Sequence, residues 1–580
     1  MSQHVLERLK TRFGNECRET SSAYGNETAV FPRHVWIDVI QFLRDDPELR
    51  FNILMDLCGA DYPERDERFE VIVHLSSLST RKRIRVKTRC PADDPTLPSI
   101  SHLYKTVDWY EREAYDLFGI RFTGHPDLKR ILCHHEFEGH ALRKDFPYNR
   151  RGVVPTPEPL VDELARKKTR QHEVIEKMLQ HAEKEERGMQ DLATQANLLN
   201  IGPSHPAMHG CFRVLVDLAG EKIQTAVAEI GYLHRCFEKE AENHDYLQVI
   251  PYTDRLNYLS SLMNNVGYCK AVEDLLSLDI PERAKWIRML ICEVSRIMDH
   301  LVCIGTNLVD IGALTNFWYF FNMREQFTDW VEALCGARLT TSYTRIGGVM
   351  RDMPPNTHSY LRQCLKDLRK ALDDVNGLLR RNRILMDRTQ GVGAISSEDA
   401  ISFGFTGPCL RACGIDYDIR KAHPYYYYDQ LEWDIPIGTH GDSYDRIFVR
   451  MEEMEQSARM VEQILEKIPT GAVMTDDRRV AFPPKHEVYG SIEGMMQHFK
   501  LVMHGIIPPA GEIYSYTEAA NGELGFYVVS DGSKNPYRIK VRGPCFTLYQ
   551  AYPALIEGGM IADAIAILGG LNIVAGEIDR

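Results

Sequence analysis

The sequence predicts a mixed α+β protein with more than one domain. A chain of 580 residues is longer than a single hydrophobic core usually organises. In its first 150 residues apolar side chains alternate along short segments, whereas its second half contains long segments with apolar residues at helical spacing. We therefore expect a small N-terminal α+β domain over residues 1–150, a linker over 151–195, and a large, mainly helical domain with peripheral strands over 196–580.

The N-terminal part begins with a helix and continues with a hairpin. Apolar residues recur at helical spacing from Val35 to Leu43, until Pro47 closes the segment. The period then changes to two, which predicts a hairpin with one buried face, carried by Phe69, Val71, Val73, Leu75, Ile84 and Val86.

The composition of residues 151–195 is typical of a linker. Residues 151–159, RGVVPTPEP, contain three prolines and cannot hold regular structure for long. Residues 160–187 are about half charged, which indicates an exposed helical tether. A helix that binds a partner is the alternative.

The second half opens with a loop and a hairpin and continues with long helices. NLLNIGPSHPAMHG has the composition of a loop, and the following segment reads as a hairpin closed near Gly220. The clearest helix begins at Pro281, a residue suited to a first helical turn, and has one apolar face through Ile304. Mixed strands and turns return after residue 500.

Composition excludes several classes of partner and location. The formal net charge is −13 and no long basic stripe occurs, which argues against nucleic acid or anionic lipid as the main partner. No run of about 18 apolar residues is present, so we expect no membrane span, and the N-terminal segment does not resemble a secretory signal. The 14 cysteines form no C-x-x-C pair, which favours a reducing, cytoplasmic compartment.

Several enzyme motifs are absent from the sequence. Neither a P-loop nor a strand-placed G-x-G-x-x-G occurs, so nucleotide binding is not supported. H-E-x-x-H and G-x-S-x-G are also missing, which argues against a metalloprotease and a hydrolase.

Histidines are the next candidates, because neutral imidazole both binds metals and carries protons. Four lie within sixteen residues, but no cysteine pair accompanies them and the segment reads as a loop, so we interpret them as surface and turn residues rather than a zinc site: His125, His134, His135 and His140. His205 and His209 are four residues apart, yet Pro203 and Pro206 argue against a helix there. They are either imidazoles that a shaped loop presents to a cavity or ordinary loop histidines.

Two further residues could carry chemistry. Tyr258 lies in a segment rich in charged and turn residues, IPYTDRLNYLS, and could donate a phenolic proton, although most tyrosines serve in packing. Asp310 ends the long helix among apolar residues. A carboxylate there needs a partner, and a histidine is a natural candidate.

Two motifs of the N-terminal part resemble the C (30-kDa-type) subunit of respiratory complex I. They are WYEREAYDLFGIRFTGHPDLKRIL (109–132) and GHALRKDFP (139–147), with Ala141 where the family usually has proline.

The second half is similar to the D (49-kDa-type) subunit of the same complex over nearly its whole length. The matching segments include NIGPSHPAMHG (200–210), IGYLHRCFEKEAE (230–242), PYTDRLNYLS (251–260), IPERAKWIRMLICEVSRI (280–297), DIGA (310–313), YTRIGGVMRDMP (343–354), DIRKAHPY (418–425), SDGSKNPYRIKVRGP (530–544) and GEIDR (576–580). Fusion of the C-type and D-type subunits in one polypeptide is an arrangement known in bacterial complexes of this family.

The resemblance implies a fold and a place in an electron-transfer chain. The D part resembles the large subunit of nickel–iron hydrogenases, with the metal cavity reused for a quinone. Electrons would come from a [4Fe–4S] cluster in a neighbouring B-type subunit, with NADH and FMN bound elsewhere and no cofactor held by this chain. The chain would lie peripherally on the cytoplasmic side of the bacterial inner membrane, docked on the membrane-arm H-type subunit of a proton-translocating NADH–quinone oxidoreductase.

The resemblance also assigns residues. His209 and Tyr258 would hydrogen-bond the two quinone carbonyls and supply protons, and Asp310 would be the partner of His209. The residues expected to line or support the pocket are His205, Ser260, Val302 and Val574. Cys236 stands where the family commonly has glycine, and Asn572 stands where relatives often carry aspartate.

Two other functions compete with this interpretation. A nickel–iron hydrogenase large subunit would need two C-x-x-C pairs, because such metals require thiolate ligands, and the corresponding segments 231–235 and 571–580 contain none. A scaffold without chemistry is the reading that we favour for residues 1–190.

Overall fold

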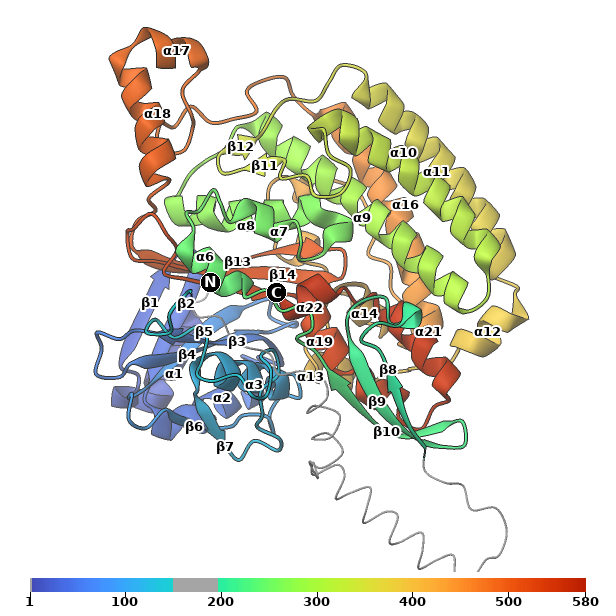
Figure 1. Ribbon diagram of the computed structural model, residues 1–580, viewed down its shortest axis with the longest axis horizontal. Helices are drawn as coiled ribbons and strands as arrows, with labels where there is room; N and C mark the ends of the chain where they lie inside the picture. Colours follow the sequence, from blue (N-terminus) through green and yellow to red (C-terminus); the bar gives the residue numbers. More distant parts are fainter. Residues whose placement is uncertain (1–2, 150–196) are drawn as a thin grey trace, which may run out of the picture.

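The structure is a computed structural model that describes residues 3–149 and 197–580. It shows a β-rich N-terminal region and a large, mainly helical region with small sheets, so the predicted mixed α+β class is confirmed (Figure 1). The predicted linker over 151–195 lies outside the described residues, and the division into domains and the likeness to hydrogenases stay predictions.

The N-terminal region is built on a five-stranded sheet in the order β1-β2-β5-β4-β3. The predicted helix is α2, and the predicted hairpin is the antiparallel pair β4–β5. The elements of this region are α1 (Gln3–Phe13), β1 (Glu19–Ala23), β2 (Asn26–Phe31), α2 (Trp36–Asp45), β3 (Ile53–Asp61), β4 (Phe69–Ser76), β5 (Arg83–Cys90), β6 (Thr96–Pro98), α3 (Val107–Phe118) and β7 (Arg121–Thr123).

The expectation that this hairpin has only one buried face is wrong. Every residue of β4 is buried. The reason is that the second face of the sheet packs against strands near the end of the chain, where Ile72 joins Tyr514 and Tyr527 in one hydrophobic cluster. Figure 1 shows β13 and β14 lying directly against the N-terminal sheet.

Long helices form the body of the second region. The predicted helix is α9, which begins directly after Pro281 and ends at Asp310. It contacts α8, α10, α16 and α21. The principal helices are α8 (Ser261–Leu276), α9 (Glu282–Asp310), α10 (Leu314–Cys335), α11 (Thr357–Leu379), α16 (Ser443–Lys467), α18 (Ile492–His504) and α21 (Ile561–Leu571).

Shorter elements connect these helices. They are α6 (Phe237–Asn243), α7 (Ile250–Thr253), α12 (Arg383–Thr389), α13 (Ser397–Ser402), α14 (Gly407–Ala412), α15 (Ile419–Ala422), α17 (Lys485–Gly490), α19 (Pro544–Gln550), α20 (Tyr552–Ile556) and α22 (Ala575–Asp579). None of the helices in the described ranges is long and apolar enough to cross a membrane.

Small sheets lie at the edge of the helical body. The predicted hairpin near Gly220 is confirmed as β9–β10, and β8 pairs with β9. The strands expected after residue 500 form a second sheet, β13-β14-β15. The strands are β8 (Asn197–Ile201), β9 (Arg213–Ala219), β10 (Lys222–Glu229), β11 (Thr344–Arg345), β12 (Gly348–Val349), β13 (Gly511–Ala519), β14 (Gly522–Ser530) and β15 (Arg538–Arg542).

Buried ion pairs join the N-terminal region to the rest. Glu113 of α3 accepts from Lys540 of β15 at 2.5 Å and from Arg580 at 2.9 Å. Arg83 of β5 pairs with Glu523 of β14 at 2.5 Å. Because these charged side chains are largely removed from water, each one needs its ion-pair partner in the other region to offset the cost of burial.

Candidate functional site

The loop between β8 and β9 presents His209. A short 3₁₀ turn covers Pro206–Met208 and stops at His209, whose backbone is left-handed with φ of 54°. No α-helix joins His205 to His209, in agreement with the proline-based prediction. His205 and His209 therefore do not lie on one face of a helix.

His209 and Asp310 meet across the fold. Nε2 of His209 lies 2.7 Å from Oδ2 of Asp310, and their side chains are 23% and 16% exposed. The contact pairs the β8–β9 loop with the last residue of α9. The carboxylate at the end of this helix thus has a histidine partner, as expected, and both side chains are partly exposed.

Tyr258 lies on a second loop against the same helix. It opens a 3₁₀ turn, Tyr258–Ser260, which packs on α9 and is capped by the side chain of Asn257. The side chain of Tyr258 is 36% exposed. Partial burial, with the negative charge of Asp299 adding to it, raises the pKa of the phenol. Tyr258 is therefore a neutral proton donor at physiological pH.

The four supporting residues occupy different positions. Ser260 is buried, and its hydroxyl has no hydrogen-bond partner among the described residues. Val302 is half-buried on α9, and Val574 is buried directly before α22. His205 is exposed, and its Nδ1 accepts a hydrogen bond from the Ala207 backbone N–H at 3.2 Å. His205 therefore shapes its own loop in this structure.

A buried carboxylate that the sequence reasoning missed stands behind Tyr258. Asp299 of α9 is fully buried. It accepts hydrogen bonds from Nδ2 of Asn257 at 2.8 Å and from Nδ2 of Asn572 at 2.7 Å. No cation of the described residues lies within ion-pair distance of it, so the two amides stabilise its charge. The sequence could have pointed to Asp299, because it is an acidic residue within an apolar helical face. The same feature drew attention to Asp310.

Asn572 has a defined role in this network. Its Nδ2 also donates to Oδ1 of Asn521 at 2.6 Å, and Asn521 donates back to the Asn572 carbonyl at 3.0 Å. An aspartate at this position would bring a second carboxylate against Asp299. Asparagine instead supplies the donor that the buried Asp299 requires.

A second buried acid lies beyond these amides. Asn521 also donates to Sγ of Cys545 at 3.4 Å, and the Cys545 thiol donates to Oε2 of Glu577 at 2.8 Å. Burial, opposed in part by the bond from Cys545, raises the pKa of Glu577 to about 7. The polar network thus runs from beside Tyr258 to a carboxyl group that titrates near neutral pH.

The backbone at Cys236 has a conformation that favours glycine. Cys236 precedes α6 with φ of 54°, in the left-handed region. Glycine adopts this conformation at little cost, whereas a residue with a Cβ is strained there. The loop keeps this shape in the structure, and Sγ of Cys236 lies 3.6 Å from Nε2 of His234.

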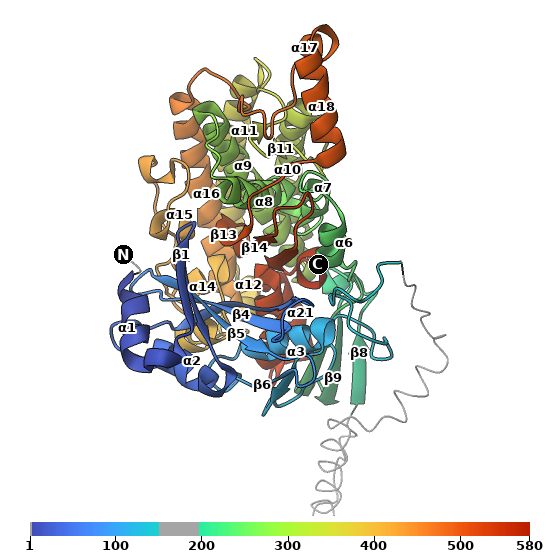
Figure 2. The ribbon, with the colours of Figure 1, turned by 90° about the vertical axis from the view of Figure 1, so that its left-hand side faces the viewer.

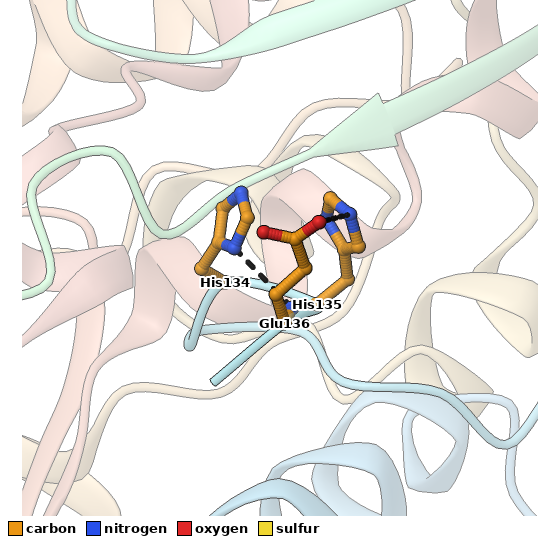
Figure 3. A group of neighbouring side chains, drawn as sticks. All are labelled: His134, His135 and Glu136. Atoms are coloured by element: carbon orange, nitrogen blue, oxygen red, sulfur yellow. Dashed lines mark hydrogen bonds and ion pairs between the residues drawn. The ribbon is translucent and has the colours of Figure 1, made fainter. Parts of the chain in front are cut away.

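The histidine-rich loop brings together fewer residues than its sequence suggested. His134, His135 and Glu136 have potential ligand atoms within 4.8 Å of one another (Figure 3). However, Nδ1 of His134 accepts from the Glu136 backbone N–H at 3.2 Å. His125 and His140 bond instead to the backbone of α3, through the carbonyls of Asp108 and Asp116. These contacts support the interpretation of the histidines as turn residues.

Two family models match separate parts of the chain. Residues 29–152 match the model of the 30 Kd subunit of the respiratory-chain NADH dehydrogenase, and residues 310–580 match that of its 49 Kd subunit. Asp310 and Val574 lie within the second match. The chain thus combines segments that match two subunits of this dehydrogenase.

Full-length relatives extend the match over His209 and Tyr258. The C/D subunit of the NADH-quinone oxidoreductase of Bdellovibrio bacteriovorus is 47% identical over 579 residues, covering 100% of this chain and 99% of the relative. A C/D subunit of the Aquifex aeolicus oxidoreductase is 40% identical over 593 residues, covering both polypeptides completely. The D subunit of the Myxococcus xanthus oxidoreductase is 52% identical over 393 residues, covering 67% of this chain and 94% of the relative.

The chain belongs to the family of fused C/D subunits of NADH-quinone oxidoreductase. It is one subunit of a multisubunit respiratory enzyme complex, and its physiological partners are the other subunits of that complex. Membership of this family rules out the alternative that the chain is the large subunit of a hydrogenase.

Proposed function

We propose that this chain forms the quinone-reduction site of the complex, with His209 and Tyr258 as the two donors to the quinone carbonyls. The observation that carries the proposal is the 2.7 Å contact of His209 with Asp310 at the end of α9, the helix on which the turn of Tyr258, a tyrosine with a raised pKa, also packs. Two different proton donors thus lie on adjacent loops against α9. Ser260, Val302, Val574 and His205 complete the proposed pocket.

The chemistry of quinone reduction matches these donors. Two electrons place negative charge on the carbonyl oxygens, and two protons then complete the quinol. A hydrogen-bond donor fixed at each oxygen stabilises the charge as it develops. Asp310, 2.7 Å from Nε2 of His209, holds the imidazole in place, so that His209 can donate a proton to the reduced quinone. Tyr258 gives the second proton from a neutral group.

The electrons and the membrane contact come from partners. We propose that a [4Fe–4S] cluster of the neighbouring B-type subunit supplies the electrons and that NADH and FMN bind in other subunits. A quinone is lipid-soluble, and none of the described helices could span a membrane. The chain therefore docks on the membrane-arm H-type subunit, peripherally on the cytoplasmic side, and the N-terminal region acts as scaffold.

The test is quinone reduction by the assembled complex carrying Tyr258→Phe or His209→Ala. Each change removes one proton donor, so we expect quinone reduction to fall about 10²-fold or more, while NADH oxidation with an artificial acceptor stays normal. Tyr360→Phe and His440→Ala, at exposed positions outside the proposed pocket, are the matched controls. Quinone reduction that survives both site variants in a normally assembled complex would show that the pocket is elsewhere.

A further inference from the structure

A helical arm projects from the body of the molecule. It consists of α17 and α18 with their flanking residues, together residues 482–507 (Figures 1 and 2). Figure 1 shows the two helices standing away from the long helices α8–α11. We refer to residues 482–507 as the arm.

The arm exposes an apolar surface. Tyr489 is 87% exposed and Ile492 is 73% exposed. The exposed apolar residues of α18 recur at intervals of three and four, which places them along one face of the helix. They are Ile492, Met495, Met496, Phe499, Val502 and Met503. Phe482 and Ile507 extend the surface at the two ends of the arm.

The contacts that hold α18 in place come mainly from the segment of the chain that precedes the arm. Only Gly494 and Leu501 of this helix are buried. Gln497 donates to the carbonyls of Arg478 and Ala481, both at 3.2 Å. A helix of 13 residues is marginal in water without tertiary packing. The apolar face of α18, which would normally pack against the rest of the protein, faces outward.

We propose that the apolar face of α18 docks into an apolar groove on another subunit of the oxidoreductase complex. The spacing of its exposed residues is that of the anchors by which an amphipathic helix occupies such a groove. Flexible methionines, here three of the six, adapt to the shape of a partner. The family shown by the relatives consists of subunits of a larger complex, so a protein partner is available.

The charges of the arm favour a protein groove over a membrane surface. Between residues 485 and 504 the two lysines, Lys485 and Lys500, are balanced by two glutamates, Glu487 and Glu493. Helices that lie on membranes carry an excess of Lys and Arg on the polar face. An electroneutral helix with an uninterrupted apolar face has no such attraction to anionic lipid.

A polar rim borders the apolar face. A hollow of about 500 Å³ beside α18 is lined in part by Arg478, Glu493 and Lys500. Protein interfaces commonly combine an apolar centre with such a rim. The apolar face and its charged border together therefore match the surface of a folded protein partner.

A photo-crosslinking experiment on the assembled complex identifies the molecule that contacts the apolar face of α18. A benzophenone amino acid replaces Met495, and the complex is irradiated in membranes. We expect a covalent adduct with a different subunit of the complex. An adduct with a second copy of this chain or with phospholipid, or no protein adduct at all, overturns the proposal.

Paired substitutions test whether the face contributes to assembly. Met496→Glu with Phe499→Glu places two charges on the docking face, and we expect at least about a tenfold loss of this chain from the assembled complex. Leu378→Glu with Ile384→Glu makes the same kind of change at exposed positions on α11 and near the start of α12 and leaves assembly normal. Equal assembly of the two variants overturns the proposal, and an unchanged melting temperature of the full chain shows that the fold is intact.

Discussion

The pairing of His209 with Asp310 depends on a contact between residues 101 positions apart. Asp310→Asn keeps the shape of the side chain and removes its charge. Because His209 loses the carboxylate that holds it, we expect kcat for quinone reduction to fall about tenfold or more with a smaller change in KM. Steady-state kinetics of the assembled complex measure this, and an unchanged kcat contradicts the proposed role of Asp310.

Asp299 acts on Tyr258 through its charge. Burial first, and then Asp299, raises the pKa of Tyr258. Asp299→Asn removes one of these causes, so the phenol loses its proton at a lower pH. We expect the alkaline limb of the quinone-reduction profile to move to lower pH. Asp434→Asn, at an exposed position, leaves the profile in place, and coincident profiles for all three proteins contradict the prediction.

Glu577 makes stability depend on pH. Its pKa rises from 4.5 to about 7 on folding because the carboxyl group is buried. Between these two values the unfolded chain releases a proton that the folded chain keeps, so stability falls as the pH rises from about 4.5 to 7 and the loss persists above 7. Glu577→Gln abolishes this loss, which is on the order of 3 kcal/mol for a shift of this size.

Thermal unfolding at two pH values checks this prediction. We expect Glu577→Gln to raise the melting temperature at pH 8 and to leave it nearly unchanged at pH 4.5. Glu466→Gln, at an exposed position, changes neither value. A gain at pH 4.5 as large as that at pH 8 would contradict the titration of Glu577.

The candidate site was only partly predictable from single residues. An acid among apolar residues needs a partner, and this reasoning anticipated the contact of Asp310 with a histidine. The same reasoning applied to Asp299, but its partners Asn257 and Asn572 lie 42 and 273 residues away. Sequence spacing carries no information on such contacts, so the roles of both amides became visible only in the fold.

At the scale of elements, α3 and β15 are joined by buried charge. Glu113→Gln leaves Lys540 and Arg580 without the carboxylate that they share. Removing one member of a buried ion pair costs about 3–5 kcal/mol, so chemical denaturation should show a loss of this size. Glu332→Gln removes a carboxylate from the exposed cluster around Arg338 and should leave stability unchanged. Equal effects would contradict the importance of the buried group.

Helices and hairpins were more predictable than their surroundings. The apolar periodicity located α2 and α9, and alternation located β4 and β5. Alternation could not indicate that β4 is buried on both faces, because the covering residues, Tyr514 and Tyr527, lie more than 400 positions later. A local pattern specifies an element, whereas burial depends on what packs against it.

At the scale of the molecule, we predict that the fusion is dispensable for association. Residues 1–150 and 196–580, produced as separate polypeptides in one cell, should co-purify because buried ion pairs and one continuous hydrophobic cluster join the two parts. The covalent connection raises the effective concentration of one part near the other. Independent elution of the two polypeptides would contradict this and would assign association to the linker.

Family motifs accounted for most of what could be predicted about the whole molecule. Physical reasoning on the residues gave the fold class, the absence of nucleotide motifs and a weak case for His209 and Tyr258. The resemblance supplied the enzyme complex, and the relatives confirmed it. The arm of residues 482–507 could not be recognised in advance, because an exposed apolar helix and a buried one have the same periodicity.

The length of α9 has a mechanical consequence for the candidate site. Its 29 residues form a rod about 43 Å long at roughly 1.5 Å per residue. Buried ion pairs of Arg288 with Glu273 and of Glu293 with Arg420 clamp the rod in its first half. At the other end Asp310 is followed by Gly312, with φ of 97°. Buried ion pairs thus fix the first half of the helix, whereas its last residue is partly exposed and paired with His209, so we expect a change of charge at Asp310 to be accommodated by the last turn rather than by a shift of the core.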